Sequence, residues 1–266
     1  MALSNLAMNI SWLSGILLHT VLIAIAFAIP KKLLTPAGYA NAWLLGVILW
    51  AGLGWRGYFL TLFYLFVGSA VTKVGFAQKE AEGTAEARGG VRGPGNVWGS
   101  ALTGAVCALI IVAIKLTSVG RLDGMDTVEL VSIWPSLLAL GFVASLSTKL
   151  SDTTATEIGK AYGKRTFLIT TLQPVPRGTE GAVSLEGTVA GAFASIALAA
   201  VAWFTGLVPL VGVGICAIAA LGATTVESII GATIEEKISW LTHDLVNIIN
   251  TTIGAALAIG IGLFVL

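Results

Sequence analysis

The sequence LVNIINTTIGAALAIGIGLFVL, residues 245–266, contains no charged side chain over 22 positions. Because about 20 helical residues cross the hydrocarbon core of a bilayer, this stretch predicts a transmembrane helix. The whole chain has the same character: 56% of its residues are hydrophobic, 11% are charged, and the mean hydropathy is +0.91. This composition excludes an ordinary soluble domain with a polar surface.

Similar apolar runs predict an all-α polytopic membrane protein, a bundle of about eight transmembrane helices in one integral membrane domain, residues 1–266. The expected spans lie near residues 10–29, 39–55, 57–72, 97–117, 128–148, 187–205, 207–225 and 245–266. The second and third are short and separated only around Gly54. No Lys or Arg precedes the first span, so we interpret it as a retained helix rather than a cleaved signal peptide.

The distribution of Lys and Arg predicts the orientation of the bundle. With both termini outside, the inner loops hold twelve of the fifteen basic residues: Lys31, Lys32, Lys73, Lys79, Arg88, Arg92, Lys149, Lys160, Lys164, Arg165, Arg177 and Lys237. Only Arg56, Lys115 and Arg121 remain outside. Because basic residues near span ends stay in the cytoplasm, the three polar segments of the chain are expected on the cytoplasmic face.

Several common functions find no support in the sequence. A net charge of +1 without a basic tract argues against a nucleic-acid partner. Cys107 and Cys216 lie inside apolar runs and are interpreted as small buried hydrophobic residues rather than a disulfide or metal pair. The two histidines form no HExxH motif, and no P-loop or serine-hydrolase elbow occurs.

The first polar segment, residues 72–100, is rich in glycine around residues 89–95. Such a segment lets backbone amides approach a phosphate, and Lys73 and Arg92 could supply charge. The alternative is a flexible, solvated loop.

The second polar segment begins with SDTTATEIGKAYGKR, residues 151–165. In a helix starting there, Asp152, Ala155 and Gly159 share one face, with Asp152 at the beginning, while Lys160 and Lys164 lie one turn apart. Carboxylates for Mg²⁺ beside cations for phosphate suit phosphoryl transfer, which depends on positioning and charge neutralisation. Two alternatives are a helix cap for Asp152 and interfacial snorkelling for the cations.

The third polar segment, residues 224–255, continues into the last span. Asp244, Asn247 and Thr251 are spaced i, i+3 and i+7, a polar stripe on a membrane helix. Such residues usually mark a functional site, although an ordinary interhelical hydrogen-bond network is the alternative.

Residues 152–159 (DTTATEIG) and 178–184 (GTEGAVS) resemble motifs of the TMEM19-like integral membrane family, which includes phytyl-phosphate kinases of plants and cyanobacteria. Residues 89–93, residues 227–233 and Asn247 extend the resemblance over most of the chain from Lys73 onward. Asp152 to Lys164 is also similar to the signature of phosphatidate cytidylyltransferases and to dolichol kinases, a superfamily that uses CTP and Mg²⁺. The chain has Ala223 and Thr224 where the cytidylyltransferases have Gly-Asp, and it lacks their Pro-Gly-His-Gly-Gly element.

The resemblance implies a Mg²⁺-dependent prenyl-phosphate kinase that converts phytyl phosphate to the diphosphate with CTP or another nucleoside triphosphate, for tocopherol and prenylquinone synthesis. It implies catalytic roles for Asp152, Glu157, Asp244 and Asn247, and Mg²⁺ binding by Asp152, Glu227 and Asp244. The expected nucleotide- and phosphate-binding residues are Lys73, Arg92, Gly93, Asn96, Lys160, Lys164, Arg177, Gly178, Thr179 and Ser184.

Two alternative functions remain open from the sequence. One is a CTP-dependent lipid cytidylyltransferase, and the other is a lipid or solute transporter or scramblase without catalysis. The expected partners are membrane lipid and the prenyl phosphate. Residues 187–191 (GTVAG) permit a homodimer, and a cyanobacterial plasma or thylakoid membrane is the expected location.

Overall fold

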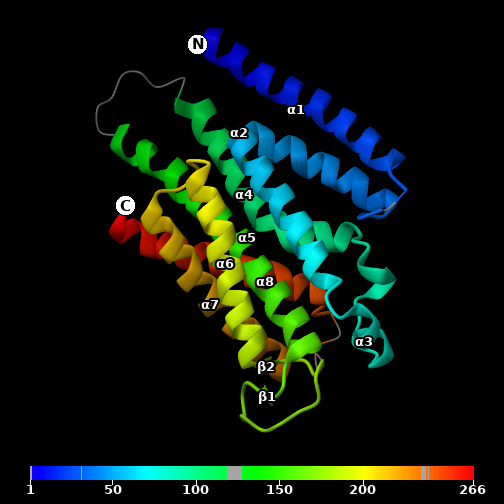
Figure 1. Cartoon of the computed structure of the whole chain (residues 1–266). Coiled ribbons are helices and arrows are strands. Elements are labelled where there is room, and N and C mark those ends of the chain that lie inside the picture. Colours follow the sequence, from blue (N-terminus) through cyan, green and yellow to red (C-terminus); the bar gives the residue numbers. More distant parts are fainter. Residues whose placement is uncertain (1, 31, 119–127, 235–237, 239) are drawn as a thin grey trace.

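The structure is a helical bundle with one small sheet (Figure 1). It is a computed structural model that describes residues 2–30, 32–118, 128–234, 238 and 240–266. The elements in chain order are α1 (Ala2–Ala28), α2 (Pro36–Thr72), α3 (Phe76–Ala81), the 3-10 turn η1 (Ala87–Gly90), α4 (Pro94–Ser118), α5 (Val128–Tyr162), β1 (Thr166–Leu168), β2 (Ala182–Ser184), α6 (Leu185–Phe204), α7 (Leu210–Thr233) and α8 (His243–Val265). The two strands pair antiparallel.

Seven helices in the described part of the chain are long and apolar enough to cross a membrane, namely α1, α2, α4, α5, α6, α7 and α8. The all-α polytopic membrane class is therefore confirmed. The count is seven rather than the predicted eight because α2 contains both the second and the third predicted spans, as two helices that meet at a kink at Gly54.

Helix α2 is bent into two legs at Gly54, whose backbone leaves the helical region with φ 66° and ψ −159°. Glycine adopts this positive φ without the steric penalty of a side chain. The two ends of α2 come back to the same region: a Cβ on Gly38 would lie 2.8 Å from the carbonyl oxygen of Arg92, and one on Gly90 would lie 3.1 Å from the side chain of Thr72. The two predicted spans thus correspond to the two legs, which diverge in Figure 1.

Helix α5 is the central element and contacts α2, α4, α6, α7 and α8. Every residue from Leu137 to Asp152 is buried, as expected for a helix that is covered on all sides. The predicted end of this span near residue 148 was wrong, because α5 continues without a break to Tyr162. The polar residues that follow the span are therefore carried on the same rigid helix.

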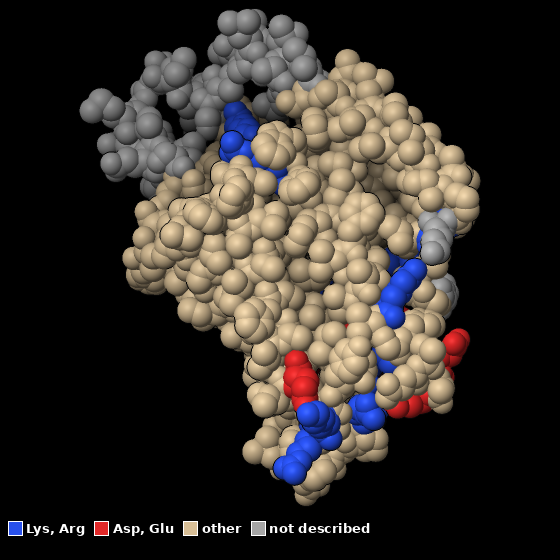
Figure 2. All heavy atoms as spheres, viewed as in Figure 1, with Lys and Arg blue, Asp and Glu red and all other residues tan. Residues whose placement is uncertain are grey.

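The three polar segments lie at one end of the bundle. The backbones of Leu34 and Arg92 form an isolated β-bridge there. The guanidinium of Arg177 lies 3.8 Å from the carboxylate of Glu82, and this ion pair joins the first two segments. Figure 2 shows the acidic and basic side chains of this face gathered mainly around that end. At the opposite end, Arg56 donates to the carbonyl oxygen of Gly206 in the α6–α7 turn.

The cytoplasmic position of the polar end stays a prediction. Lys31, Arg121 and Lys237, which contributed to that prediction, lie outside the described residues.

Single cysteines test the orientation, because the native Cys107 and Cys216 are buried and should resist labelling. We expect Glu82→Cys and Tyr162→Cys to react with an impermeant maleimide from the cytoplasmic side only. Pro209→Cys, in the exposed α6–α7 turn, should react only from the other side. Labelling of Tyr162→Cys and Pro209→Cys from the same side would contradict the arrangement.

Candidate functional site

Asp152 lies inside α5 rather than at a helix beginning, which corrects the sequence-based expectation and removes the helix-cap alternative. Its helix face of small residues does admit a neighbouring helix, as predicted. A Cβ on Gly187 of α6 would lie 2.5 Å from the carbonyl oxygen of Ala155, and one on Gly191 would lie 2.8 Å from that of Ser151. The backbones of α5 and α6 therefore approach closely beside Asp152.

A buried ion pair lies at the centre of the site. The ammonium of Lys149 donates to Oδ2 of Asp152 at 2.5 Å and to Oδ1 of Asn247 at 2.6 Å, so it connects α5 with α8. The side chains of Lys149 and Asp152 are only 9% and 8% exposed. Charges at such depth require good pairing, because removal from water is costly for each ion.

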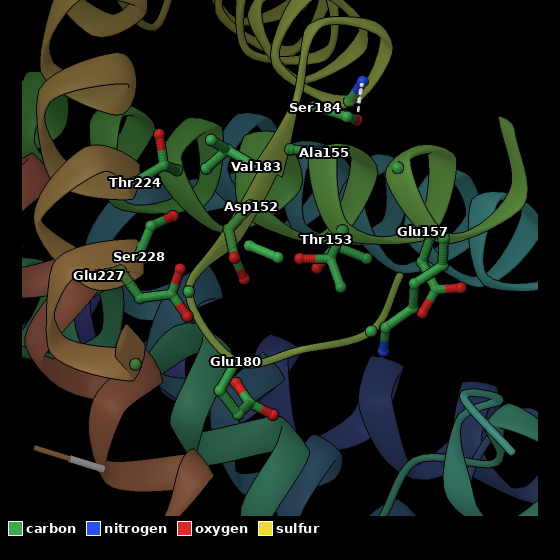
Figure 3. A pocket seen from close by; sticks show the side chains of 18 of the residues that line it. Asp152, Thr153, Ala155, Glu157, Glu180, Val183, Ser184, Thr224, Glu227 and Ser228 are labelled. Atoms are coloured by element: carbon green, nitrogen blue, oxygen red, sulfur yellow. Dashed lines mark hydrogen bonds between the residues drawn. The ribbon is translucent and has the colours of Figure 1, made fainter. Parts of the chain in front are cut away.

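A polar pocket of about 150 Å³ opens beside Asp152. It is bordered by α5, the β2 region and α7, and Figure 3 shows the carboxylates of Asp152 and Glu227 pointing toward one another across it. The hydroxyl groups of Thr153 and Ser228 lie around the same space. Thr224 also lines it, but its hydroxyl donates to the carbonyl oxygen of Ala220 at 2.9 Å. We call this space, together with its lining residues, the carboxylate pocket.

The carboxylate pocket suits Mg²⁺. This ion takes oxygen ligands and, in phosphoryl-transfer sites, is held by one or two carboxylates together with substrate phosphates. Asp152 and Glu227 supply two such carboxylates from different helices. Within the described residues no group of three or more His, Cys, Asp and Glu side chains could hold a metal, so phosphate oxygens and water would complete the coordination.

Asp244, a predicted catalytic residue and metal ligand, does not line the carboxylate pocket. A Cβ on Gly95 of α4 would lie 1.9 Å from its Oδ2, so Asp244 packs on the beginning of α4. Further along the same stripe, Thr251 lies 3.0 Å from Thr103 of α4. The stripe thus serves helix packing at Asp244 and Thr251, whereas Asn247 turns toward Lys149.

Glu157, the other predicted catalytic carboxylate, forms a buried ion pair with Lys79 of α3. The Lys79 ammonium also donates to the carbonyl oxygen of Thr72 at 2.8 Å, and its side chain is 0% exposed. Glu157 still lines the carboxylate pocket. Lys73, the predicted phosphate-binding cation of the first polar segment, is exposed. It lines neither the carboxylate pocket nor the second polar pocket described next.

A second polar pocket, of about 60 Å³, surrounds Arg92. Nη1 of Arg92 donates to the hydroxyl of Tyr64 at 2.7 Å, and that hydroxyl donates to Ser100 at 2.8 Å. Asn96 accepts a hydrogen bond from the backbone amide of Gly93 at 2.9 Å and so caps the beginning of α4. A guanidinium fixed in this way can bind a phosphate through two parallel hydrogen bonds. We call this space the arginine pocket.

The two polar pockets share a wall. Glu86, Lys149, Thr153 and His243 line both of them. Lys149 is therefore the buried cation between the Asp152–Glu227 pair and Arg92.

The remaining predicted residues lie at the end of α5 and in the segment that connects α5 to α6. Lys160, Gly178, Thr179 and Ser184 line the carboxylate pocket. Arg177 reaches back to the carbonyl oxygens of Lys160 and Ala161 at 3.5 Å and so ties the turn to the end of α5. Lys164 is exposed and does not line it.

Known proteins with similar sequences identify the family. The profile of the family described as Integral membrane protein DUF92 matches residues 19–255. The chain belongs to the DUF92 family.

Three relatives share most of this chain. An uncharacterized membrane protein of Synechocystis sp. is 58% identical over 250 residues, which cover 94% of this chain and 91% of that protein. "Protein VTE6, chloroplastic" of Arabidopsis thaliana is 42% identical over 258 residues, covering 96% of this chain and 73% of that protein. An uncharacterized membrane protein of Methanocaldococcus jannaschii is 24% identical over 90% of each chain. No solved structure matches.

Two buried lysines of this DUF92 protein were missed as site residues. Lys149 precedes Asp152 by three positions, a spacing that places both on one helix face and could have signalled the pair. Lys79 has no such local signal, because its partner Glu157 is 78 residues away.

We expect Lys79→Met to destabilise the protein by about 3–5 kcal/mol, because it leaves the Glu157 carboxylate buried without a partner. Lys73→Met is the matched control: it removes an exposed cation from the same segment and should change the free energy of unfolding by about 0.5 kcal/mol or less. Denaturant unfolding in detergent micelles measures both.

The double variant Lys79→Met/Glu157→Leu separates anchoring from chemistry. If the pair only anchors α3 to α5, the double variant recovers both stability and activity. Recovered stability without activity would give Glu157 a direct role. Equal stability of Lys79→Met and the control Lys73→Met would contradict the anchoring role.

Proposed function

We propose that this DUF92 protein is a prenyl-phosphate kinase. It transfers the terminal phosphoryl group of a nucleoside triphosphate, with CTP favoured, to a lipid monophosphate, and the products are the lipid diphosphate and a nucleoside diphosphate. Phytyl phosphate is the proposed acceptor, for tocopherol and prenylquinone synthesis. The motif resemblance at residues 152–159 and 178–184 supports this function.

The observation that carries the proposal is the wall shared by the two polar pockets. A pocket with two facing carboxylates suits a metal-bound triphosphate, and a pocket with a fixed guanidinium suits an anionic acceptor. With Lys149 in the wall between them, a cation lies where the phosphoryl group passes from one pocket to the other. Phosphoryl transfer needs this combination of positioning and charge stabilisation.

In the proposed reaction, Arg92 orients the acceptor phosphate. An oxygen of that phosphate attacks the γ-phosphorus of the nucleoside triphosphate. A new P–O bond forms, and the bond to the β–γ bridging oxygen breaks with its electron pair leaving on the nucleoside diphosphate. Lys149 stabilises the negative charge on the transferred group. No general base is needed, because the attacking phosphate is already an anion at neutral pH.

Asp152 and Glu227 are the residues that would hold Mg²⁺. When bound, the ion neutralises charge on the β- and γ-phosphates. Asp152 also forms the ion pair with Lys149. Glu157 and Lys160 complete the polar border of the carboxylate pocket, and Ser184 lies at its α6 side.

The position of the site argues against a transporter. Transporter substrate sites lie near the bilayer midplane, between repeated halves of the bundle. Here the ion pairs gather at one end of the bundle, next to the described loops of the polar segments. An end position is suited to a water-soluble nucleotide that meets a membrane-bound lipid, and the proposed side is the cytoplasm or its stromal equivalent.

Product analysis tests the reaction. We expect purified protein with phytyl phosphate, CTP and Mg²⁺ to yield phytyl diphosphate and CDP, and EDTA to abolish turnover until Mg²⁺ is restored. ATP in place of CTP tests the nucleotide. A CDP-lipid with released pyrophosphate would instead establish a cytidylyltransferase, and no turnover of any prenyl phosphate would overturn the kinase.

We expect Asp152→Asn and Glu227→Gln each to lower kcat by about 100-fold or more and to raise the Mg²⁺ concentration for half-maximal rate, because each removes an anionic oxygen ligand. Glu186→Gln, which removes a carboxylate on α6 outside the carboxylate pocket, should stay within about twofold of the parent. The shift in Mg²⁺ dependence separates ligand loss from misfolding. An unchanged Mg²⁺ dependence in both site variants would refute the assignment.

A further inference from the structure

A third cavity lies between α1, the two legs of α2 and the beginning of α4. It has a volume of about 280 Å³, and its walls are almost entirely apolar, with Ile23, Ala42, Leu49, Leu62 and Ala101 among them. The bend at Gly54 creates this space, because it spreads the two legs of α2 so that α1 and α4 close the sides (Figure 1). We call it the chain cavity.

One end of the chain cavity is polar. Tyr64, Arg92, Asn96 and Ser100 line both the chain cavity and the arginine pocket. Among the described residues that line the cavity, Arg92 is the only one with a cationic side chain. It donates to the hydroxyl of Tyr64 at 2.7 Å, and that hydroxyl donates to Ser100 at 2.8 Å, so the guanidinium is held in place. An apolar cavity that ends at a fixed guanidinium is complementary to a molecule with a hydrocarbon chain and an anionic head.

The other part of the cavity is bordered by aromatic packing. Tyr58 lines the cavity, and the centroid of its ring lies 4.3 Å from the ring centroid of the buried His19. Along the first leg of α2 the lining runs from Tyr39 to Leu49, about 15 Å at the helical rise of 1.5 Å per residue. The space is thus long in one direction, and its volume is at the lower limit of ordinary ligand pockets, about 300 Å³. These dimensions fit one chain rather than two.

We propose that the chain cavity binds the single isoprenoid chain of the acceptor lipid, with the phosphate of that lipid on Arg92. This inference rests on the proposed kinase function and adds the subsite that selects the substrate. The chain enters from a bilayer, which is as apolar as the cavity, so burial alone contributes little to selection. Selection therefore comes from the fit of the chain to the walls.

Chain-length preference tests the walls. Ala42→Phe fills the cavity from α2 without touching the polar pockets, and we expect kcat/KM for a twenty-carbon prenyl phosphate to fall about tenfold, with a much smaller loss for a ten-carbon one. Ala200→Phe is the matched control, because Ala200 is a half-buried residue of α6 outside all three cavities. It should leave the ratio of kcat/KM for the twenty-carbon substrate to kcat/KM for the ten-carbon substrate unchanged. Equal losses on both substrates for Ala42→Phe, or the same change of ratio in the control, would overturn the assignment.

Labelling of Ala42→Cys gives a binding measurement that does not depend on turnover or on tolerance of a large side chain. We expect a twenty-carbon prenyl phosphate to protect this thiol from maleimide, whereas inorganic phosphate should not. Protection without turnover of any lipid phosphate would uphold the chain cavity and overturn the kinase function. Turnover without protection, or equal protection by diacylglycerol phosphate, would overturn the single-chain cavity.

Discussion

The buried ammonium of Lys149 is the interaction on which the arrangement of the site depends. It holds Asp152 of its own helix and Asn247 of α8 at hydrogen-bond distance. A lone charge at this depth would be strongly unfavourable, so the three groups stabilise one relative position of α5 and α8. Because Lys149 also borders both polar pockets, the same contact that fixes the helices determines where a cation faces the ligands.

Close backbone contacts then place the remaining groups around α5. Small residues bring α6 against Ala155 and Ser151, which puts the turn with Gly178 and Ser184 over the carboxylate pocket. On another side, the Lys79–Glu157 pair fixes α3 to the same helix. One buried helix thus carries Asp152, Glu157 and Lys160 at successive turns, and its rigidity keeps their spacing.

Much of this organisation could be predicted from the sequence, because its signals are local. Apolar runs predicted the spans, and the spacing of Ala155 and Gly159 predicted a close helix contact. Helix rotation, in contrast, is not contained in local spacing. His243 and Asp244 are neighbours, about 100° apart on the helix, and only His243 reaches the polar pockets while Asp244 packs on Gly95. In the same way, Lys79 is buried and Lys73 is exposed. Local spacing could not predict this difference, because the partner of Lys79 comes from a distant helix.

The succession of cavities reflects the different solvents from which two substrates would arrive. The carboxylate pocket is polar and lies at the end of the bundle, where a nucleotide can enter from water. The chain cavity is apolar and lies between membrane-crossing helices, where a lipid chain can stay at bilayer depth. Arg92 lies at the junction of the chain cavity and the arginine pocket, and Lys149 at the junction of the two polar pockets. An anionic head group anchored in this series is brought to a nucleotide without removal of its chain from an apolar environment, so the large cost of moving that chain into water never arises.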